Sequence, residues 1–225
     1  MTISATTQGI KPGVCLSTAR PANPFEGMTI YETDTDLLSA YNGSAWVYQS
    51  PLRFTTEAAR DAVITSPTEG MIAYLTAPTV PAATSTAYLP TGIQTIYNGS
   101  VWVCVTPVGS KNPSSSQAFT GSYVDITAGG TVLSVTLVTG TTALVSFSGR
   151  IQSNGTYARL SVKTTTVASS DEWAVFNRSS VEITCDRTFI FSGLTAGTNT
   201  FTMQCMTHTS GSIADQMYLT VQGIA

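Results

Sequence analysis

The sequence contains few residues that could act together in catalysis. Its single histidine, His208, lies in the segment CMTHTSG, where the local sequence does not complete a Ser-His-Asp or Cys-His arrangement. Asp171 and Glu172 could be compared with the paired carboxylates of a glycosidase, but adjacent residues of a strand point to opposite faces of a sheet. We therefore expect no catalytic residues, and we interpret His208 as a residue of a strand end or a loop.

Metal or cofactor binding is not indicated either. Asp34 and Asp36 lack the further oxygen ligands that would define a calcium site, so we interpret them as turn residues. No two cysteines have the Cys-x-x-Cys spacing of zinc and thioredoxin-type sites; they are Cys15, Cys104, Cys185 and Cys205. Cys185 and Cys205 lie in apolar segments and are interpreted as buried free thiols, with a disulfide as the alternative. We expect no metal and no cofactor.

Aromatic and polar side chains beside predicted turns are the remaining candidates for a binding site. Four residues of the C-terminal half could contact a glycan: Tyr157, Trp173, Asn177 and Arg178. The alternative for each of them is ordinary packing or solvation. Trp46 and Trp102, which recur in a repeated motif, could also form a sugar-binding groove, but a repeated tryptophan after a turn is more often part of a core.

The composition predicts that strands carry these residues. Only 10% of the 225 residues are charged, while Ser, Thr, Gly and Ala are abundant, which is typical of all-β chains. The ten basic and thirteen acidic residues are spread over both halves, so neither half has the basic surface expected for nucleic acid or anionic lipid. No apolar run approaches the ~18–20 residues of a membrane helix. The low charge favours an oligomer or an assembled particle.

A small β-meander occurs twice, in residues 24–49 and 67–106. The segment PFEGM at 24–28 returns as PTEGM at 67–71, and YNGSAWV at 41–47 returns as YNGSVWV at 97–103. Asn-Gly readily adopts a tight hairpin turn, so each copy is predicted to contain three short strands. The second copy is 13 residues longer, within TAPTVPAATSTAYLPTG, which we interpret as a loop. So small a unit needs partners, and both tryptophans are expected to be mostly buried.

Two further segments belong to the predicted N-terminal half. Residues 1–23 are expected to be an extended N-terminal arm, either unstructured or ordered against a neighbouring subunit. One helix is predicted over residues 55–64, with Thr55 or Thr56 as its cap and Glu57 in its first turn. Its apolar face is expected to hold Ala58, Ala59, Ala62 and Val63.

The second half of the chain is predicted to be a separate domain. Residues 107–117 are rich in Pro, Gly and Ser and are interpreted as a linker. Residues 118–225 contain eight or nine short alternating strands, among them separate ones at 181–185 and 188–191, which predicts a jelly-roll β-sandwich. The predicted fold is therefore mainly β: an N-terminal arm, a repeated meander region over 24–106 with one short helix, and a C-terminal jelly roll.

Three phrases of the N-terminal half resemble structural proteins of tailed bacteriophages: KPGVCLSTARPANPFEGMTIYETDT, YNGSAWV and TTEAARDAVITSPTEGM. They are similar to short head-fibre, capsid-decoration and minor tail or tail-fibre proteins, and the resemblance covers roughly residues 9–106. The C-terminal half is similar in pattern to tumour necrosis factor-like jelly rolls, through TALVSFSGRI and FSGLTAGTNTFTMQ.

From its residues the protein is expected not to be an enzyme, and the resemblance implies a homotrimeric virion protein that is assembled in the host cytoplasm. One end would be fixed to other virion proteins, and residues 1–23 are expected to make this attachment. The jelly roll would point outward, where host-surface glycans are candidate partners, whereas nucleic acid and membrane are not. The chain has no collagen-like repeat and no heptads, which favours a compact spike or knob over a long fibre. It is short and has no obvious tail-tube or baseplate module, so we expect it on the head or near the neck, with a tail location as the alternative.

Overall fold

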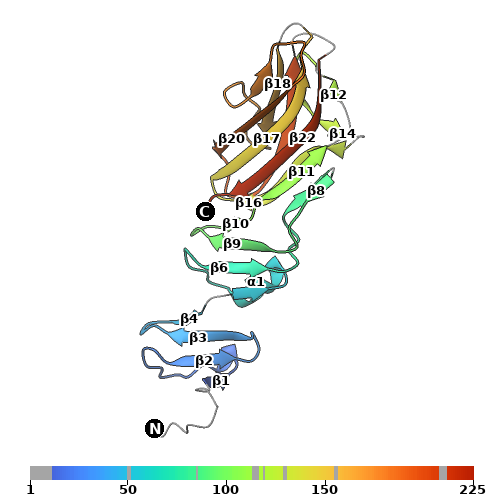
Figure 1. Cartoon of the computed structure of the whole chain (residues 1–225). Helices are drawn as coiled ribbons and strands as arrows, with labels where there is room; N and C mark the ends of the chain where they lie inside the picture. Colours follow the sequence, from blue (N-terminus) through green and yellow to red (C-terminus); the bar gives the residue numbers. More distant parts are fainter. Residues whose placement is uncertain are drawn as a thin grey trace, which may run out of the picture. The chain divides into compact units, whose positions relative to one another are not determined.

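The computed structural model describes residues 12–49, 52–84, 86–112, 117–118, 120–128, 131–154, 157–207 and 212–225. These residues form a mainly β structure with several sheets and one short α-helix (Figure 1). The chain separates into two compact units, Met1–Arg53 and Phe54–Ala225, which we call the N-terminal and C-terminal units. No helix in the described ranges is long and apolar enough to cross a membrane.

The N-terminal unit is a four-stranded sheet in the order β1-β2-β3-β4. Strand β1 (Gly13–Cys15) pairs in parallel with β2 (Thr29–Glu32), and β2, β3 (Leu37–Tyr41) and β4 (Trp46–Tyr48) form the antiparallel meander expected from the sequence. A single 3₁₀ turn, η1 (Ser17–Ala19), follows β1. Strand β1 is extended, as predicted, but it pairs within its own unit, and η1 is not extended. The prediction of an arm without structure of its own is therefore wrong for these two elements, while residues 1–11 lie outside the described ranges.

A second four-stranded sheet has the same construction, in the order β10-β9-β6-β5. It consists of β5 (Leu52–Phe54), which spans the boundary between the units, and of β6 (Ile72–Leu75), β9 (Ile93–Tyr97) and β10 (Trp102–Cys104). Helix α1 (Glu57–Val63) follows β5 as η1 follows β1. The repeated unit is thus larger than the predicted meander, because it also includes the preceding strand and helical turn.

Matching hydrogen bonds fix the correspondence between the two copies. The amide of Thr33 donates to the carbonyl of Cys15 (3.0 Å), and the amide of Thr76 donates to the carbonyl of Phe54 (2.9 Å). In the repeated turn, the side-chain oxygen of Asn42 accepts from the amides of Ser44 and Ala45, and that of Asn98 accepts from the amides of Ser100 and Val101. We call the two copies the first and second repeat.

The repeated tryptophans occupy equivalent places but differ in burial. Tyr41 and Trp46 have ring centroids 5.5 Å apart at 57°, and Tyr97 and Trp102 have centroids 5.5 Å apart at 56°. Trp102 is 8% exposed and lies under the guanidinium of Arg60, 4.5 Å from the ring centroid. Trp46 is only half-buried. The expected burial is therefore confirmed for Trp102 and is incomplete for Trp46.

Helix α1 lies within the predicted range 55–64. The side chain of Thr56 caps it by accepting a hydrogen bond from the amide of Ala59. The predicted apolar face is wrong, because Ala58, Ala59 and Ala62 are exposed. Arg60 is the buried residue of this helix, where it covers Trp102 and its Nη1 donates to the hydroxyl of Thr95 (3.4 Å).

Two segments predicted to lack structure supply strands to the jelly roll. The insertion of the second repeat contains β7 (Ala82–Ala83), which pairs with β16 (Ser134–Thr139), and β8 (Thr86–Tyr88), which pairs with β11 (Val108–Asn112). Strand β11 lies within the predicted linker 107–117 and also pairs with β22 (Ile213–Gly223). The loop and linker assignments are therefore wrong for these residues.

The jelly roll consists of two facing six-stranded sheets, as the alternating pattern predicts (Figure 1). One sheet has the order β20-β17-β22-β11-β8, with β12 (Gln117–Ala118) also pairing with β22. The other has the order β19-β18-β21-β16-β7, with β13 (Val124–Asp125) pairing with β21. The remaining bounds are Thr127–Ala128 (β14), Thr131–Val132 (β15), Thr142–Gln152 (β17), Ala158–Lys163 (β18), Val175–Asn177 (β19), Ile183–Ser192 (β20) and Gly197–Thr207 (β21).

Alternate residues of the long strands form the core between these sheets. Its fully buried members include Val145, Ile151, Leu160, Phe201, Met203 and Leu219. Residues 181–185 and 188–191 were predicted as separate strands, but β20 runs unbroken from Ile183 to Ser192 along the edge of its sheet. All four cysteines are free, with Cys205 buried and Cys185 half-buried.

The second repeat packs directly on the jelly roll within the C-terminal unit. A Cβ at Gly223 would lie 2.6 Å from Cγ1 of Val103 and 2.7 Å from the carbonyl oxygen of Cys104, so only glycine fits at this approach. The side chain of Gln222 donates a hydrogen bond to the carbonyl of Val105 (2.8 Å). Together with the pairing of β7 and β8, these contacts make the second repeat and the jelly roll one packed body.

Candidate functional site

Tyr157 and Arg178, two of the predicted glycan contacts, lie together on the outer side of the sheet that contains β18 and β19. The guanidinium carbon of Arg178 is 4.2 Å from the ring centroid of Tyr157 and 5.5 Å from that of Phe176. The two rings meet edge to face, with centroids 6.3 Å apart. Phe176 is 55% exposed. We call Tyr157, Phe176 and Arg178 the aromatic–arginine cluster.

A second arginine borders this cluster but is held by a carboxylate. The guanidinium carbon of Arg159 lies 5.1 Å from the ring centroid of Tyr157, and its Nη1 is 2.6 Å from Oδ2 of Asp171. The hydroxyl of Tyr123 donates to Oδ1 of the same carboxylate (2.7 Å). Burial, with help from this hydrogen bond, raises the pKa of Tyr123 well above its usual value. Asp171 is therefore committed to two partners.

Asn177 belongs to the core beneath the surface. It is 3% exposed, and its side-chain nitrogen donates to the carbonyls of Ile151 (2.8 Å) and Val181 (2.9 Å). Its side-chain oxygen accepts from the amide of Ser179 (2.8 Å). These bonds close the turn that follows β19. The polar atoms of the Asn177 side chain are therefore used within the protein and do not face a ligand.

Trp173 lies apart from Tyr157, in an aromatic group between the two sheets. Its ring stacks on Phe189 at 13°, with centroids 6.0 Å apart, and its indole nitrogen donates to the carbonyl of Val162 (3.0 Å). A cavity of about 270 Å³ adjoins this group and is also lined by Glu172 and Arg187. Because one face of the indole is covered by Phe189, this tryptophan packs as part of the sandwich.

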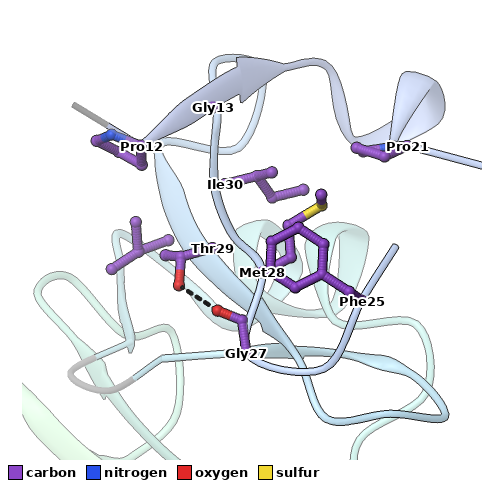
Figure 2. A pocket seen from close by; sticks show the side chains of 9 residues that line it. Pro12, Gly13, Pro21, Phe25, Gly27, Met28, Thr29 and Ile30 are labelled. Atoms are coloured by element: carbon purple, nitrogen blue, oxygen red, sulfur yellow. Dashed lines mark hydrogen bonds between the residues drawn. The ribbon is translucent and has the colours of Figure 1, made fainter. Parts of the chain in front are cut away.

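The N-terminal unit carries an apolar groove of about 650 Å³ (Figure 2). None of its lining residues is charged, and Phe25, on its rim, is 65% exposed. The lining residues are Pro12, Gly13, Pro21, Phe25, Gly27, Met28, Thr29, Ile30 and Leu38. Sequence reasoning missed this groove, because its residues come from the segment expected to be an arm and from the first strand of the meander.

The groove has a local cause in the differences between the two repeats. Gly13 of β1 corresponds to Leu52 of β5. Gly13 lies two residues before Cys15, whose carbonyl accepts from a threonine amide, and Leu52 lies two residues before Phe54, whose carbonyl does the same. In the second repeat, Leu52 and Ile64, which ends α1, are both buried. At the corresponding places the first repeat has Gly13 and the single 3₁₀ turn η1. The first repeat thus lacks apolar side chains that the second repeat supplies from its own sequence.

The first repeat also has a polar core. The carboxylate of Glu32, fully buried, accepts from Nε of Arg20 (2.6 Å) and from the hydroxyls of Thr35 and Ser39 (both 3.2 Å). The hydrogen bond to Glu32 raises the pKa of Arg20. The second repeat has Leu75 in place of Glu32, so the two copies share a backbone but have different cores.

The candidate groups for chemistry are dispersed. Asp34 and Asp36 lie in the turn between β2 and β3, which confirms the turn interpretation of both. Asp34 accepts hydrogen bonds from the amide and hydroxyl of Ser17, which lower its pKa, and Asp36 accepts from the hydroxyl of Tyr31. No group of three or more His, Cys, Asp or Glu that could hold a metal ion occurs within the residues that the structure covers. His208 lies outside the described ranges.

Comparison with known proteins gives only distant likenesses. The chain matches no family model, and no curated protein sequence is similar to it. Among solved structures, a CBM36-1 domain of a xylanase from the hindgut metagenome of Trinervitermes trinervoides has 13% identity and a TM-score of 0.34, over 53% of this chain and 99% of that one. The globular domain of zebrafish complement 1qA protein has 14% identity and a TM-score of 0.27, over 46% and 68%.

A viral capsid structure, that of infectious bursal disease virus Gx strain, has 9% identity and a TM-score of 0.32, over 62% of this chain and 41% of that chain. Similarities at this level do not indicate a shared function.

Proposed function

We propose that the chain is a structural protein of a bacteriophage virion: a trimeric fibre or decoration protein, fixed to the capsid, that displays its jelly roll as a knob. The resemblance of roughly residues 9–106 to tailed-phage structural proteins, carried by the three phrases quoted above, supports this assignment. Assembly would take place in the host cytoplasm.

The observation that carries the proposal is the repeated unit with an unfilled first copy. The second repeat completes its own core and is built into the jelly roll through β7 and β8. The first repeat forms a separate compact unit and leaves an uncharged groove open. An open apolar groove on a small unit is typical of a protein interaction site.

The same features support attachment through the N-terminal unit. Residues 1–23 remain the proposed attachment segment, and part of it, Pro12, Gly13 and Pro21, lines the groove. The groove therefore gives this segment a specific surface at which a virion partner would bind.

Self-association is supported by apolar side chains on the outer faces of both repeats. Val14 is exposed on the first, and Ile72 and Tyr74 are exposed on the second. With few charges to keep copies apart, such faces favour contact between sister chains. A homotrimer is the proposed state, and the jelly roll acts without catalysis.

Immunogold labelling of purified particles with an antibody against the jelly roll tests the location. Label on the capsid would support the proposal, and label restricted to the tail would favour the second candidate below. Light scattering of the full chain tests the oligomer, with an expected mass near three times 23.6 kDa. A stable monomer at micromolar concentration would contradict the trimer.

A second candidate is a tail-fibre or minor tail protein that binds a host-surface receptor or glycan. The aromatic–arginine cluster favours it, because an exposed ring beside a guanidinium is suited to a sugar.

A further inference from the structure

We propose that the aromatic–arginine cluster binds an anionic sugar, such as a uronic acid, with the ring of the sugar on Phe176 and its carboxylate on Arg178. This inference deepens the second candidate function and depends on an outward-facing jelly roll for its biological role. The binding itself is a property of the purified protein and is testable without particles.

The state of Arg178 indicates the charge of the ligand. Within the described part of the chain, Arg178 makes no ion pair, although six such pairs are present. Its neighbour Arg159, by contrast, is bound to Asp171. An exposed guanidinium with open donors favours a carboxylate, which it can bind through two parallel hydrogen bonds.

The aromatic rings fix where that guanidinium lies. Arg178 is 4.2 Å from the centroid of Tyr157, and Tyr157 is itself braced edge to face against Phe176. Cation–π contacts with both rings restrict the long side chain, so less conformational entropy is lost when it binds an anion. The cluster is therefore partly organised before a ligand arrives.

Phe176 supplies an apolar surface beside the charge. It is 55% exposed and lies on β19, opposite Arg159 of β18. An exposed ring can stack against the C–H face of a sugar, and the adjacent guanidinium distinguishes an acidic sugar from a neutral one. Asn177 does not take part because it is buried and its side chain is fully hydrogen-bonded, and Trp173 does not because its ring packs on Phe189.

Biolayer interferometry with the full chain tests the proposal. The probes are polygalacturonate, in which every ring carries a carboxylate, its methyl ester, which keeps the rings without the charge, and neutral dextran. We expect binding to polygalacturonate that weakens as salt rises and that falls at least about tenfold for the ester.

Variants locate the site. Arg178→Gln and Phe176→Ala should each weaken binding about tenfold or more, while Arg53→Gln, which removes an exposed arginine from β5, should leave it unchanged. Circular dichroism confirms that each variant is folded. Equal binding of acid and ester, or an equal loss in Arg53→Gln, would overturn the proposal.

A third outcome also counts against the inference. If Phe176→Ala or Arg178→Gln changed the mass measured by light scattering without changing polysaccharide binding, the cluster would be a contact between protein chains. Capsid labelling by immunogold together with no polysaccharide binding would refute this inference alone. Polysaccharide binding without any particle label would refute the virion assignment alone.

Discussion

Gly13 and Leu52 occupy the same position in the two repeats, and the groove of the N-terminal unit lies where Gly13 leaves space. A Cβ added at Gly13 would come no closer than 3.5 Å to another heavy atom, Cγ2 of Ile30, so the site can accept a side chain. The two copies thus act as a natural comparison of a filled and an unfilled core.

Gly13→Leu should fill the groove and stabilise the N-terminal unit by about 1–2 kcal/mol, part of the value for a fully buried leucine. Hydrogen exchange of the amides of β2 and β3 measures this change. Gly27→Leu is the matched control, because Gly27 also lines the groove but has a φ of +84° that a leucine would strain. Exchange should be slower in Gly13→Leu and not in Gly27→Leu. Slower exchange in both variants, or in neither, would contradict the conclusion that the space at Gly13 is an unfilled core position. Under the proposed function, Gly13→Leu should also reduce incorporation into particles.

The buried pair of Arg20 and Glu32 should behave as a unit. Glu32→Leu copies Leu75 of the second repeat but leaves Arg20 without its carboxylate, at a cost of about 2–3 kcal/mol, because Arg20 is partly exposed. Adding Arg20→Met should recover most of that loss, since two apolar side chains can replace a buried pair. Hydrogen exchange of the amides of β2 and β3 measures the stability of the single and double variants. If the loss in the double variant equalled the sum of the losses in the two single variants, the two residues would not be coupled.

The two tryptophans should differ in their contribution to stability. Trp102→Ala removes a buried ring and the surface under Arg60, so we expect a loss of about 3–5 kcal/mol from the C-terminal unit. Trp46→Ala removes a half-buried ring, with an expected loss of about 1–2 kcal/mol from the N-terminal unit. Urea unfolding with a probe in each unit compares them. Equal losses of unfolding free energy in the two variants would contradict the prediction that the burial of each tryptophan determines its contribution.

The ion pair between Arg150 and Asp215 should make the jelly roll sensitive to acid. Two hydrogen bonds from Arg150, at 2.8 and 2.6 Å, lower the pKa of Asp215 below its ordinary value of 3.8. The stabilisation is therefore complete above the unfolded pKa and is lost as the pH falls through the folded one.

Asp215→Asn should cost about 1 kcal/mol at pH 7 and flatten the stability curve between about pH 5 and pH 2. Glu182 is 3.0 Å from the same arginine but is more exposed, so Glu182→Gln should have a smaller effect. Thermal melts across this pH range measure all three proteins, and a steeper acid dependence in Asp215→Asn would contradict the assignment.

The sequence predicts most of the elements that rest on local signals. The Asn-Gly turns, the cap of α1 at Thr56 and the alternation along β17 are all present in the structure. It does not predict elements that exist only through distant partners. Strand β1 has only three residues and pairs with β2 across a long connection. Strand β11 has the composition of a linker, and it is a strand because it pairs with β8 and β22.

The candidate site was predicted only in part for the same reason. The sequence predicts Tyr157 and Arg178 only as residues beside turns, and the structure brings them together through the pairing of β18 with β19. Phe176 was missed because it lies within a strand, where an apolar side chain is expected to be buried. Asn177 and Trp173 have the residue types of a binding site, but their hydrogen bonds run inward, which composition does not reveal.

The insertion of the second repeat contributes one strand to each sheet of the jelly roll. This limits the positions at which recombination of the gene would leave the sheets of the protein intact. A crossover near residues 50–51 would exchange the first repeat and leave every sheet of the C-terminal unit whole. A crossover between the second repeat and the jelly roll would remove β7 and β8 and expose β16 and β11 as new edges. Chimeras that acquire a new knob should therefore inherit the second repeat with it, while the first repeat can be exchanged independently.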